Sequence, residues 1–526
     1  MTRILVTEKI GDEGLALLSQ AGDVEVRLNL TPAELIELLP PFDALVVRSQ
    51  TKVTAAVVAA GTNLKVVGRA GTGVDNIDLK AATERGLLVV NAPGANSIAV
   101  AELTLGLILS IARRLPQAHA SLMSGKWERG LFMGSEVRGK TLGLLGLGRI
   151  GTEVARRARA FEMNVLAYDP FISAERAAQL GVTPASLDDV LAQADIVSIH
   201  VPLLDATRHL INAERIAQMK TGAWLINCAR GEIVDEAAVA AALHSGQLGG
   251  AGLDVWATEP PSASPLMGAP NLVGLPHLGA STGEAQLVAA VDVAEGVVDA
   301  LQGRTPRYAV NAPFVAPEEW QVVAPYLTLG TQLAKLSTQL VREPAKSYEI
   351  VYSGELTEHT TEPIRLAVLS GLLASTTESR VTPVNAALLA RQRGLAVSER
   401  TDPQSEQYAA LLELNVTTAD GTVYCFGGTA VNHELHIVYV RGYRLDVVPS
   451  PFMLFTTHRD QPGMIGRLGT VLGQLDINIS SMHVGRLAPR GQAMMVLTLD
   501  DPLPAAALTE VTALDGIEEA YAVQLD

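Results

Sequence analysis

The sequence predicts an α/β protein of several domains, in which parallel sheets covered by helices come first. Three observations lead to this fold class. The chain has 526 residues, which is more than one ordinary domain needs. Apolar residues make up 48% of it and aromatic residues only 4%, so its cores must be built from Ala, Leu and Val. Short apolar strands alternate with helical stretches in two successive sets, which is typical of parallel sheets.

The first set of strands lies within residues 1–95, and the second begins near residue 140. The helical run 97–116 joins the two sets, and residues 279–303 lead out of the second. We therefore expect two α/β lobes that face each other across a cleft, with the chain returning to its first lobe after about residue 285.

The rest of the chain divides at two Pro-rich stretches, residues 311–326 and 447–452. Between them lies a block with mixed strand and helix signals. The last 75 or so residues read as strand, helix, strand, strand, helix, strand, which fits a ferredoxin-like unit. The expected domains are a first lobe of 1–97 with 285–315, a second lobe of 98–284, an α+β block of 318–448 and a terminal unit of 452–526.

Composition excludes several classes of function. The net charge of −16 argues against non-specific binding of nucleic acid, although a pocket for a small anion can still be locally positive. Cys228 and Cys425 have neither disulfide nor metal-ligand spacing, so no metal site is predicted. The most apolar run, residues 97–112, carries Glu102 and is expected to be a buried helix. The sequence thus predicts a soluble, cytoplasmic protein with no membrane or nucleic-acid partner.

A dinucleotide motif opens the second set of strands. Gly146, Gly148 and Gly151 form G-x-G-x-x-G between an apolar strand and a helix, and Asp169 ends the next strand. Small residues let the backbone and the helix N-terminus approach a pyrophosphate. The Asp169 carboxylate can accept hydrogen bonds from the ribose hydroxyls and would repel a 2′-phosphate, and no Arg follows directly in 169–173. The motif predicts a Rossmann-type domain that binds NAD in preference to NADP.

Three later stretches carry residues with catalytic chemistry. Arg230 follows a strand in 226–239, Asp254 and Glu259 lie in 252–260, and His277 follows an apolar strand. Together with residues 69–78 and 125–151, these motifs resemble the D-isomer-specific 2-hydroxyacid dehydrogenases, and within them the phosphoglycerate dehydrogenase group. The resemblance is strong over about residues 1–315.

This resemblance implies a flavodoxin-like substrate lobe beside the Rossmann-type domain, and it assigns roles to the catalytic residues. His277 is expected to be the general base, Glu259 to orient its imidazole, and Arg230 to clamp the substrate carboxylate. The residues expected to contact NAD are Thr72, Gly146, Gly148, Arg149, Ile150, Gly151, Asp169, Val201, Cys228, Arg230, Asp254, His277, Gly279 and Ala280. Val201 and Cys228 are expected to contribute backbone or packing contacts, with Cys228 as a small buried residue and not a nucleophile.

The same resemblance predicts a phosphorylated substrate. Arg48, Arg69 and Arg129 supply candidate cations, Arg129 from a loop that reaches across a dimer, and the backbone at Gly71 supplies N–H donors. The implied reaction is oxidation of D-3-phosphoglycerate to 3-phosphohydroxypyruvate with NAD, the first step of L-serine synthesis. Two alternatives stay open: another 2-hydroxyacid dehydrogenase, such as a glyoxylate or hydroxypyruvate reductase, and a dinucleotide-sensing corepressor. The terminal unit argues against the corepressor, because those proteins carry a disordered tail.

Residues 454–486 resemble an ACT domain, a small ligand-binding unit of amino-acid biosynthetic enzymes. L-serine is the expected effector, bound where ACT units of a homodimer or homotetramer meet, with His458 and Asp460 on one loop and Asn478 opening the next strand. An ACT unit that only holds subunits together is the rival interpretation. The block 318–448 resembles the intervening regulatory domain of the long-form enzymes and holds no recognisable catalytic motif.

Overall fold

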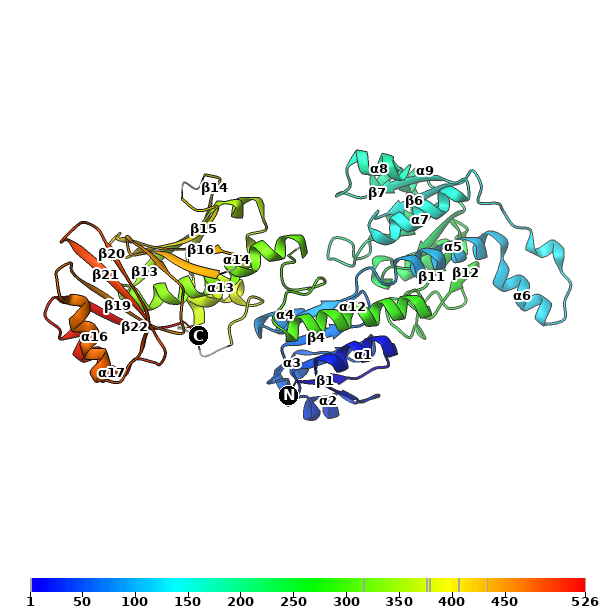
Figure 1. The fold of residues 1–526 in the computed structure, drawn as a ribbon. Coiled ribbons are helices and arrows are strands. Elements are labelled where there is room, and N and C mark those ends of the chain that lie inside the picture. Colours follow the sequence, from blue (N-terminus) through cyan, green and yellow to red (C-terminus); the bar gives the residue numbers. More distant parts are fainter. Residues whose placement is uncertain are drawn as a thin grey trace.

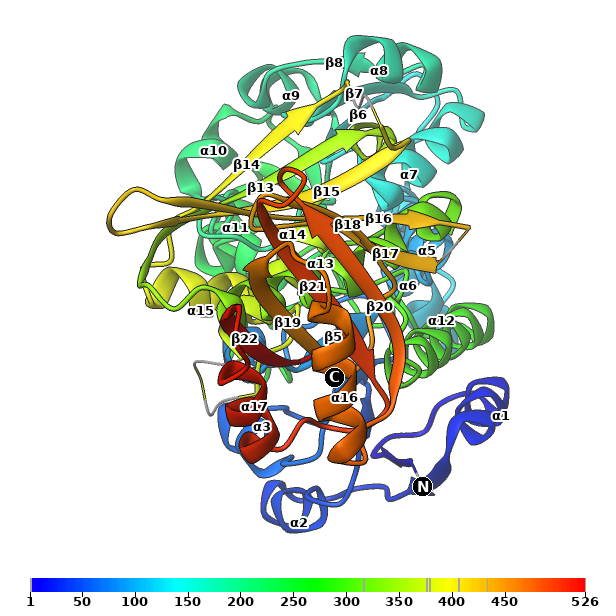
Figure 2. The same ribbon diagram turned by 60° about the vertical axis from the view of Figure 1, so that its left-hand side comes forward.

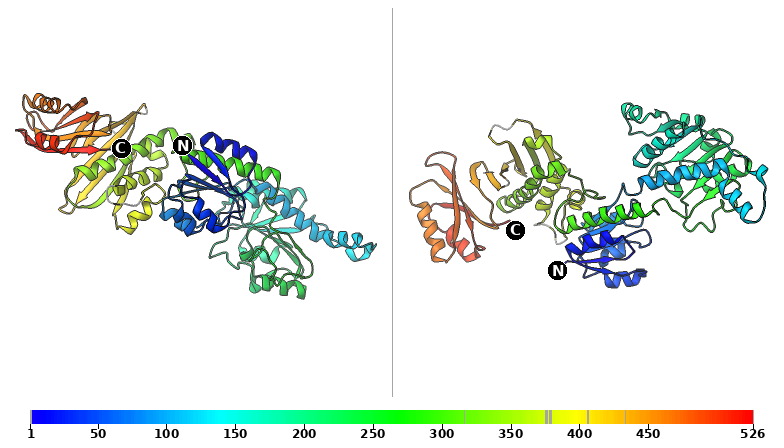
Figure 3. Two further views of the ribbon diagram at one scale, coloured as in Figure 1. Left: turned by 90° about the horizontal axis from the view of Figure 1, so that it is seen from below. Right: turned by 45° about the vertical axis from the view of Figure 1, so that its right-hand side comes forward.

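The computed structural model describes residues 2–315, 317–374, 377, 380–404, 407–432 and 434–525. It contains four sheets, and the two parallel ones lie apart from the two C-terminal ones along an elongated molecule (Figures 1 and 3). The predicted α/β fold class, with a Rossmann-type and a flavodoxin-like lobe, is confirmed by strand order. Within the described ranges, no helix combines the length and apolar character needed to cross a membrane.

The first lobe has a five-stranded parallel sheet in the flavodoxin-like order β2-β1-β3-β4-β5. Its strands are β1 (Arg3–Val6), β2 (Asp23–Val26), β3 (Ala44–Val47), β4 (Val66–Arg69) and β5 (Leu88–Asn91), and its helices are α1 (Asp12–Ala21), α2 (Pro32–Leu38), α3 (Ala55–Ala60), α4 (Leu79–Glu84) and α12 (Gly283–Leu301). Helix α12 reaches this sheet from far along the sequence and packs beside α1 (Figure 1), with Ala290, Val293 and Val297 in the same core as Ile4 and Val66. The lobe is therefore discontinuous in sequence.

The second lobe has a seven-stranded parallel sheet in the order β12-β11-β10-β9-β6-β7-β8, which contains the Rossmann arrangement. Its strands are β6 (Thr141–Leu145), β7 (Asn164–Tyr168), β8 (Thr183–Pro184), β9 (Ile196–Ile199), β10 (Ala223–Asn227), β11 (Leu248–Leu253) and β12 (Leu272–Gly274). Its helical segments are α5 (Ser97–Arg113), α7 (Arg149–Ala160), α8 (Ala174–Leu180), α9 (Leu187–Gln193), α10 (Ala213–Gln218), the short η2 (Gly231–Ile233) and α11 (Glu236–Ser245). As predicted, the apolar run at 97–112 is a largely buried helix, with Glu102 on its exposed side.

An arm projects from this lobe on the far side from the C-terminal sheets (Figure 1). It contains α6 (Leu115–Met123) and the 3₁₀ turn η1 (Arg129–Phe132). None of the residues of α6 is buried. Trp127 and Met133 are 78% and 81% exposed, which is unusual for large apolar side chains on a lone subunit.

The two C-terminal sheets lie next to each other (Figure 2). The mixed sheet has the order β14-β13-β15-β16-β17-β18 and the antiparallel one the order β20-β21-β19-β22. The mixed sheet contains β13 (Ala345–Gly354), β14 (Val397–Asp402), β15 (Ala410–Thr418), β16 (Val423–Val431), β17 (Glu434–Val440) and β18 (Tyr443–Val447), with α13 (Pro317–Leu340), η3 (Glu355–Glu358), α14 (Glu362–Ala374) and α15 (Ala386–Gln392). The antiparallel sheet contains β19 (Phe452–Arg459), β20 (Ile479–Arg486), β21 (Gln492–Leu499) and β22 (Ile517–Gln524), covered by α16 (Met464–Gln474) and α17 (Ala505–Thr512). The last sheet has the predicted ferredoxin-like topology.

One hydrophobic core joins these two sheets. Leu336 of α13 and Leu412 of β15 belong to the same cluster as Met453, Met494 and Tyr521 of the terminal sheet. A chain cut between the two sheets would therefore expose apolar surface on both parts.

The mixed sheet's unit also contacts the first lobe. Arg380 donates a hydrogen bond to the carbonyl of Leu64 (2.9 Å), and the Thr382 hydroxyl donates to the carbonyl of Gly86 (3.0 Å). Leu64 lies just before β4, and Gly86 lies just past the C-terminal end of α4. They connect the C-terminal half of the protein to the lobe that carries β4.

Candidate active site

The glycine turn has the geometry that a dinucleotide needs. Gly146 adopts a φ of 97°, which favours glycine, and a Cβ at Gly151 would lie 2.2 Å from the carbonyl oxygen of Gly146. A Cβ at Gly148, in contrast, would meet no atom within 4 Å. Gly148 is the N-cap of α7, so the open space lies where backbone N–H groups point out of the helix. Two glycines are thus required by packing, and the third leaves room for a ligand.

Asp169 lies at the edge of this space, at the end of β7. One carboxylate oxygen accepts a hydrogen bond from the backbone N–H of Leu147 (2.8 Å) and the other from that of Phe171 (2.9 Å). The carboxylate lines a cavity of about 550 Å³ together with Gly148, Arg149 and Arg176. The open glycine edge, the helix N-terminus and the fixed carboxylate fit a dinucleotide.

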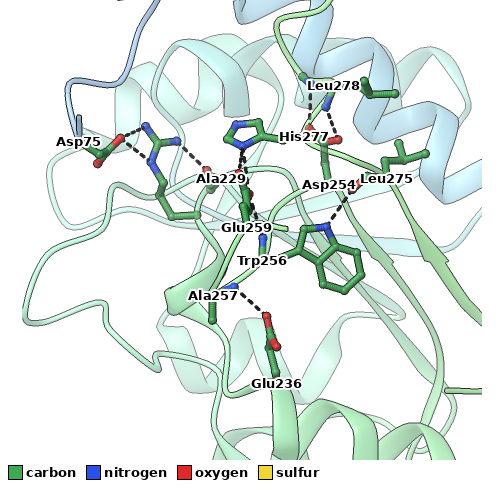
Figure 4. Close-up of polar contacts among 12 residues, drawn as sticks. Asp75, Ala229, Glu236, Asp254, Trp256, Ala257, Glu259, Leu275, His277 and Leu278 are labelled. Carbon is green, nitrogen blue, oxygen red and sulfur yellow. Dashed lines mark hydrogen bonds and ion pairs between the residues drawn. The ribbon is translucent and has the colours of Figure 1, made fainter. Parts of the chain in front are cut away.

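His277 and Glu259 form a pair at the carboxyl ends of the second sheet's strands (Figure 4). The Nδ1 atom of His277 lies 2.8 Å and 3.0 Å from the two carboxylate oxygens of Glu259. An ionised carboxylate only accepts hydrogen bonds, so in the neutral imidazole Nδ1 carries the proton and Nε2 the lone pair. The His277 side chain is 49% exposed, which places that lone pair within reach of a substrate.

Buried groups fix the backbone around this pair. The carboxylate of Asp254, which is 1% exposed, accepts hydrogen bonds from the N–H groups of Leu278 (2.7 Å) and Gly279 (2.8 Å). Burial raises the pKa of Asp254, against the effect of these hydrogen bonds and of His277. The indole of Trp256 donates to the carbonyl of Leu275 (2.9 Å; Figure 4). His277 itself adopts a left-handed φ of 57°, a conformation that such flanking bonds hold in place.

Arg230 follows β10 and bridges the two lobes. Its Nε and Nη2 atoms donate to one carboxylate oxygen of Asp75, at 3.1 and 2.9 Å, and its Nη1 donates to the carbonyl of Ala229 (2.7 Å). Asp75 lies in the loop after β4 of the first lobe. Although partial burial works the other way, the Arg230 guanidinium holds the pKa of Asp75 below its ordinary value.

Two further arginines of the first lobe lie within electrostatic range of this point. Arg69 ends β4, and its pKa is lowered by burial and by the positive charge of Arg230, with a smaller effect from Arg48. The Nε atom of Arg69 is buried and has no hydrogen-bond partner among the described residues. The backbone at Gly71 lies against this guanidinium, since a Cβ there would be 1.7 Å from Nη1. Cations held this close together are suited to an anion with several charges.

Arg129, also predicted to bind the substrate, is not part of this cluster. It lies on η1 of the projecting arm, beside Phe161 and the C-terminal end of α5. The arm lies on the opposite side of the second lobe from β4 (Figure 1). Within one chain the structure does not bring Arg129 to the cleft.

The other predicted cofactor residues surround the glycine turn and the cleft. Thr72 donates its hydroxyl to the carbonyl of Ala92 (3.0 Å), and the side chain of Val201 lies against Gly146. Ile150 packs on the core of the second lobe. Burial raises the pKa of the Cys228 thiol to about 12, so this buried residue is not a nucleophile at neutral pH. Ala280 follows the turn that Asp254 holds.

Comparison with known proteins identifies the family. Residues 105–279 match the model described as D-isomer specific 2-hydroxyacid dehydrogenase, NAD binding domain, residues 322–441 match the D-3-phosphoglycerate dehydrogenase intervening domain, and residues 452–516 match the ACT domain. A D-3-phosphoglycerate dehydrogenase of Synechocystis is 45% identical over 100% of this chain and 95% of its own. The enzyme of that name from Bacillus subtilis is 41% identical over the full length of both chains.

The chain belongs to the D-3-phosphoglycerate dehydrogenase family. The predicted resemblance to D-isomer-specific 2-hydroxyacid dehydrogenases is confirmed, and so is a domain that binds NAD. Among solved structures, the TT0316 protein of Thermus thermophilus is similar with a TM-score of 0.55 and 39% identity, over 59% of this chain and 100% of its own. A glyoxylate reductase from Paecilomyes thermophila has a TM-score of 0.55 and 30% identity, over 60% of this chain and 99% of its own.

The residues predicted to bind the effector, His458, Asp460 and Asn478, do not form one pocket within a single chain. His458 lies in strand β19, where its side chain is buried, and not on the loop with Asp460 where the sequence had placed it. The amide of Asp460 bonds to Gly491 at one end of β21, whereas Asn478 bonds to Asp500 beyond the other end. An eight-residue strand is about 26 Å long, so a single-chain pocket is ruled out.

The charge of Asp460 also has a partner already. Its carboxylate accepts hydrogen bonds from the Arg486 guanidinium (3.1 Å) and the Arg490 N–H (3.2 Å). These hydrogen bonds and the Arg486 charge hold the pKa of Asp460 below its ordinary value. An effector's ammonium group would therefore have to share this carboxylate with Arg486.

Several residues at the cleft were not identified from the sequence. Asp75 binds Arg230, and Gly73 leaves room for its guanidinium. The Glu8 carboxylate accepts hydrogen bonds from the N–H groups of Arg48 and Thr51, which fixes the loop after β3. Arg176 lines the nucleotide cavity, seven positions after Asp169. Residues 71–76, GTGVDN, belong to a motif of the sequence, but only the folded structure shows that the Asp75 carboxylate binds Arg230.

Proposed function

We propose that this chain oxidises the C2 hydroxyl of D-3-phosphoglycerate to 3-phosphohydroxypyruvate with NAD, the first step of L-serine synthesis. The observation that carries the proposal is the His277–Glu259 pair beside Asp75 and Ala229, the two residues that bind Arg230 (Figure 4), with the charges of Arg48 and Arg69 on the facing lobe. The pair supplies a base, Arg230 a carboxylate clamp, and the first-lobe arginines cations for a phosphate. The proposed domain bounds remain 1–97 with 285–315, 98–284, 318–448 and 452–526.

His277 is the proposed general base. Its Nε2 lone pair takes the proton of the C2 hydroxyl while Glu259 keeps the proton on Nδ1 and stabilises the imidazolium that forms. NAD, when bound at the glycine turn, would supply the acceptor for the hydride that leaves C2. Asp254 keeps the backbone at 277–279 in place through its two hydrogen bonds, so the imidazole does not have to be ordered during the reaction.

Arg230 is the proposed clamp for the carboxylate and the C2 oxygen, because a planar guanidinium can bind both with parallel N–H donors. Arg48 and Arg69 are the proposed phosphate ligands. Arg129 is assigned to the same site only across a dimer, contributed by the arm of a second subunit. The exposed Trp127 and Met133 on that arm support burial against another copy.

A panel of 2-hydroxy and 2-oxo acids, each with and without a 3-phosphate, tests the substrate. We expect kcat/KM for the phosphorylated acids to exceed that for glycerate and glyoxylate, and this preference to be lost in Arg69→Gln. Higher efficiency with the unphosphorylated acids would favour a glyoxylate or hydroxypyruvate reductase. Absence of turnover with every acid, despite binding of NAD, would favour a dinucleotide-sensing corepressor.

Asp169 is proposed to select NAD. In the double variant Asp169→Ala with Phe171→Arg, we expect the ratio of kcat/KM for NAD to that for NADP to fall by at least about tenfold, because repulsion of the 2′-phosphate is removed and an exposed cation is added. Steady-state kinetics with both cofactors measures the ratio. Phe171→Arg alone is the control. If the ratio of kcat/KM for NAD to that for NADP is unchanged in the double variant, Asp169 does not discriminate between the two cofactors.

L-serine is proposed as a feedback effector at a site between two ACT units. Because Asn478 and Asp460 lie at opposite ends of one sheet, two copies must pair their sheets so that the Asn478 of one meets the Asp460 of the other. A homodimer or homotetramer follows from this arrangement. His458, buried behind Asp460, is proposed to support the site and not to line it.

We expect serine to lower kcat in the intact chain, and Asn478→Ala to abolish inhibition while kcat without serine stays within about twofold. Thr470→Ala, which alters an exposed hydroxyl on α16, is the matched control. Calorimetry showing no binding at millimolar serine would instead make the ACT unit a purely structural module.

A further inference from the structure

Asp75 holds the arginine that is proposed to bind the substrate. Both the Nε and Nη2 atoms of Arg230 donate to the same oxygen of Asp75, at 3.1 and 2.9 Å. Figure 4 shows this contact beside the His277–Glu259 pair. Neither the sequence motifs nor the family resemblance assigned a role to this carboxylate.

A count of donors shows what the contact leaves available. A guanidinium has five N–H groups. Two of them bind Asp75, and Nη1 uses one on the carbonyl of Ala229. One N–H therefore remains on each terminal nitrogen, Nη1 and Nη2. Such a pair is suited to receive a carboxylate end-on.

The loop around Asp75 is shaped to this guanidinium. A Cβ at Gly73 would lie 2.0 Å from Nη2 of Arg230 and 2.7 Å from the bound carboxylate oxygen. Any side chain at Gly73 would push Arg230 out of its position. The backbone and carboxylate of one loop thus enclose one edge of the arginine.

The ion pair between Asp75 and Arg230 adds little to the stability of the fold. The Asp75 side chain is 65% exposed and that of Arg230 is 32% exposed, and ion pairs so open to solvent contribute little to folding. The pair does have an electrostatic consequence for the cleft. The Asp75 charge offsets the repulsion between Arg230 and Arg69, which allows both cations to stay near one anionic substrate.

We propose that Asp75 is a positioning residue for the reaction: from the substrate lobe it fixes the orientation of Arg230, which belongs to the NAD lobe, and so presents the two remaining N–H donors to the substrate carboxylate. The inference rests on the proposed role of Arg230 as carboxylate clamp. It does not depend on whether that acid carries a phosphate.

The test compares Asp75→Asn with Asp78→Asn in the full-length protein. Asp78 lies three residues along the same loop and caps α4 by accepting the N–H of Ala81, a task that Asn performs equally well. Both variants remove one negative charge from the loop, but only one of them alters the contact to Arg230.

For Asp75→Asn we expect KM for the 2-hydroxy acid to rise about tenfold or more, a smaller fall in kcat, and an unchanged KM for NAD. Asp75→Glu, which keeps the carboxylate, should recover most of the loss. In an Arg230→Lys background, where the planar fork is gone, Asp75→Asn should add less than about twofold to the loss of kcat/KM.

Three results would overturn the proposal. A lower KM in Asp75→Asn would mean that Asp75 competes with the substrate for Arg230. An equal rise in KM in Asp78→Asn would mean that only loop charge matters, and a full additional loss in the Arg230→Lys background would mean that Asp75 acts elsewhere. All measurements use the acid that the wild-type protein turns over best, so a wrong substrate assignment would show in the wild type and leave the judgement on Asp75 intact.

Discussion

Replacing His277 by alanine is expected to lower kcat by about two to four orders of magnitude, the usual contribution of a positioned general base. The imidazole is held through Nδ1 by Glu259, which leaves Nε2 as the proton acceptor. NAD affinity should hardly change, because the glycine turn and Asp169 lie apart from the imidazole. Single-turnover kinetics measures the chemical step, and fluorescence titration measures binding of the nicotinamide cofactor.

Glu259→Gln is the companion variant. A glutamine amide can present an N–H to Nδ1, which would favour the tautomer that carries its proton on Nε2 and block the base. We therefore expect a loss of kcat that approaches the loss in His277→Ala, and little further loss in the double variant. If His277→Ala kept more than about a tenth of the wild-type rate with chemistry limiting, His277 would not be the base.

Gly148→Ala and Gly151→Ala are expected to weaken NAD binding for different reasons. At Gly151 a Cβ would overlap the carbonyl oxygen of Gly146 at 2.2 Å, so the turn itself must shift. Overpacking of this kind costs about 1–3 kcal/mol, which corresponds to roughly 5- to 150-fold in an equilibrium constant. At Gly148 the Cβ meets no atom, so we expect the fold to tolerate it and only the approach of the pyrophosphate to be blocked.

The two variants are therefore distinguished by stability without cofactor. We expect Gly151→Ala to lower the midpoint of urea unfolding of the NAD lobe and Gly148→Ala to leave it unchanged, while both raise the Kd for NAD by about tenfold or more. Gly222→Ala, a glycine of the same lobe in open space but with a φ of 83°, controls for backbone strain alone. Normal NAD affinity in Gly148→Ala would show that the backbone at Gly148 does not contact the pyrophosphate.

The sequence was sufficient where a local pattern determines the structure. Alternating apolar strands and helices indicated two parallel sheets, and G-x-G-x-x-G before a helix with Asp169 after the next strand indicated the nucleotide site. The strand-helix-strand-strand-helix-strand order of the terminal unit was equally clear. Each of these features depends on residues within about thirty positions of one another. They can therefore be predicted from the spacing of residue types along the sequence.

Contacts between distant segments were decided only by the tertiary structure. Asp75 and Arg230 are 155 residues apart in sequence, and no periodicity or motif links them. Arg129 was predicted to bind the substrate from a loop that reaches across a dimer, and only the tertiary structure shows that this loop, η1, belongs to an arm outside the cleft of its own chain. For the effector site where ACT units meet, the sequence predicted His458 and Asp460 on one loop and Asn478 at the start of the next strand. The pairing of β19 and β20 with β21 instead separates Asp460 from Asn478 by the length of a strand, since register is set by which residues face one another across strands.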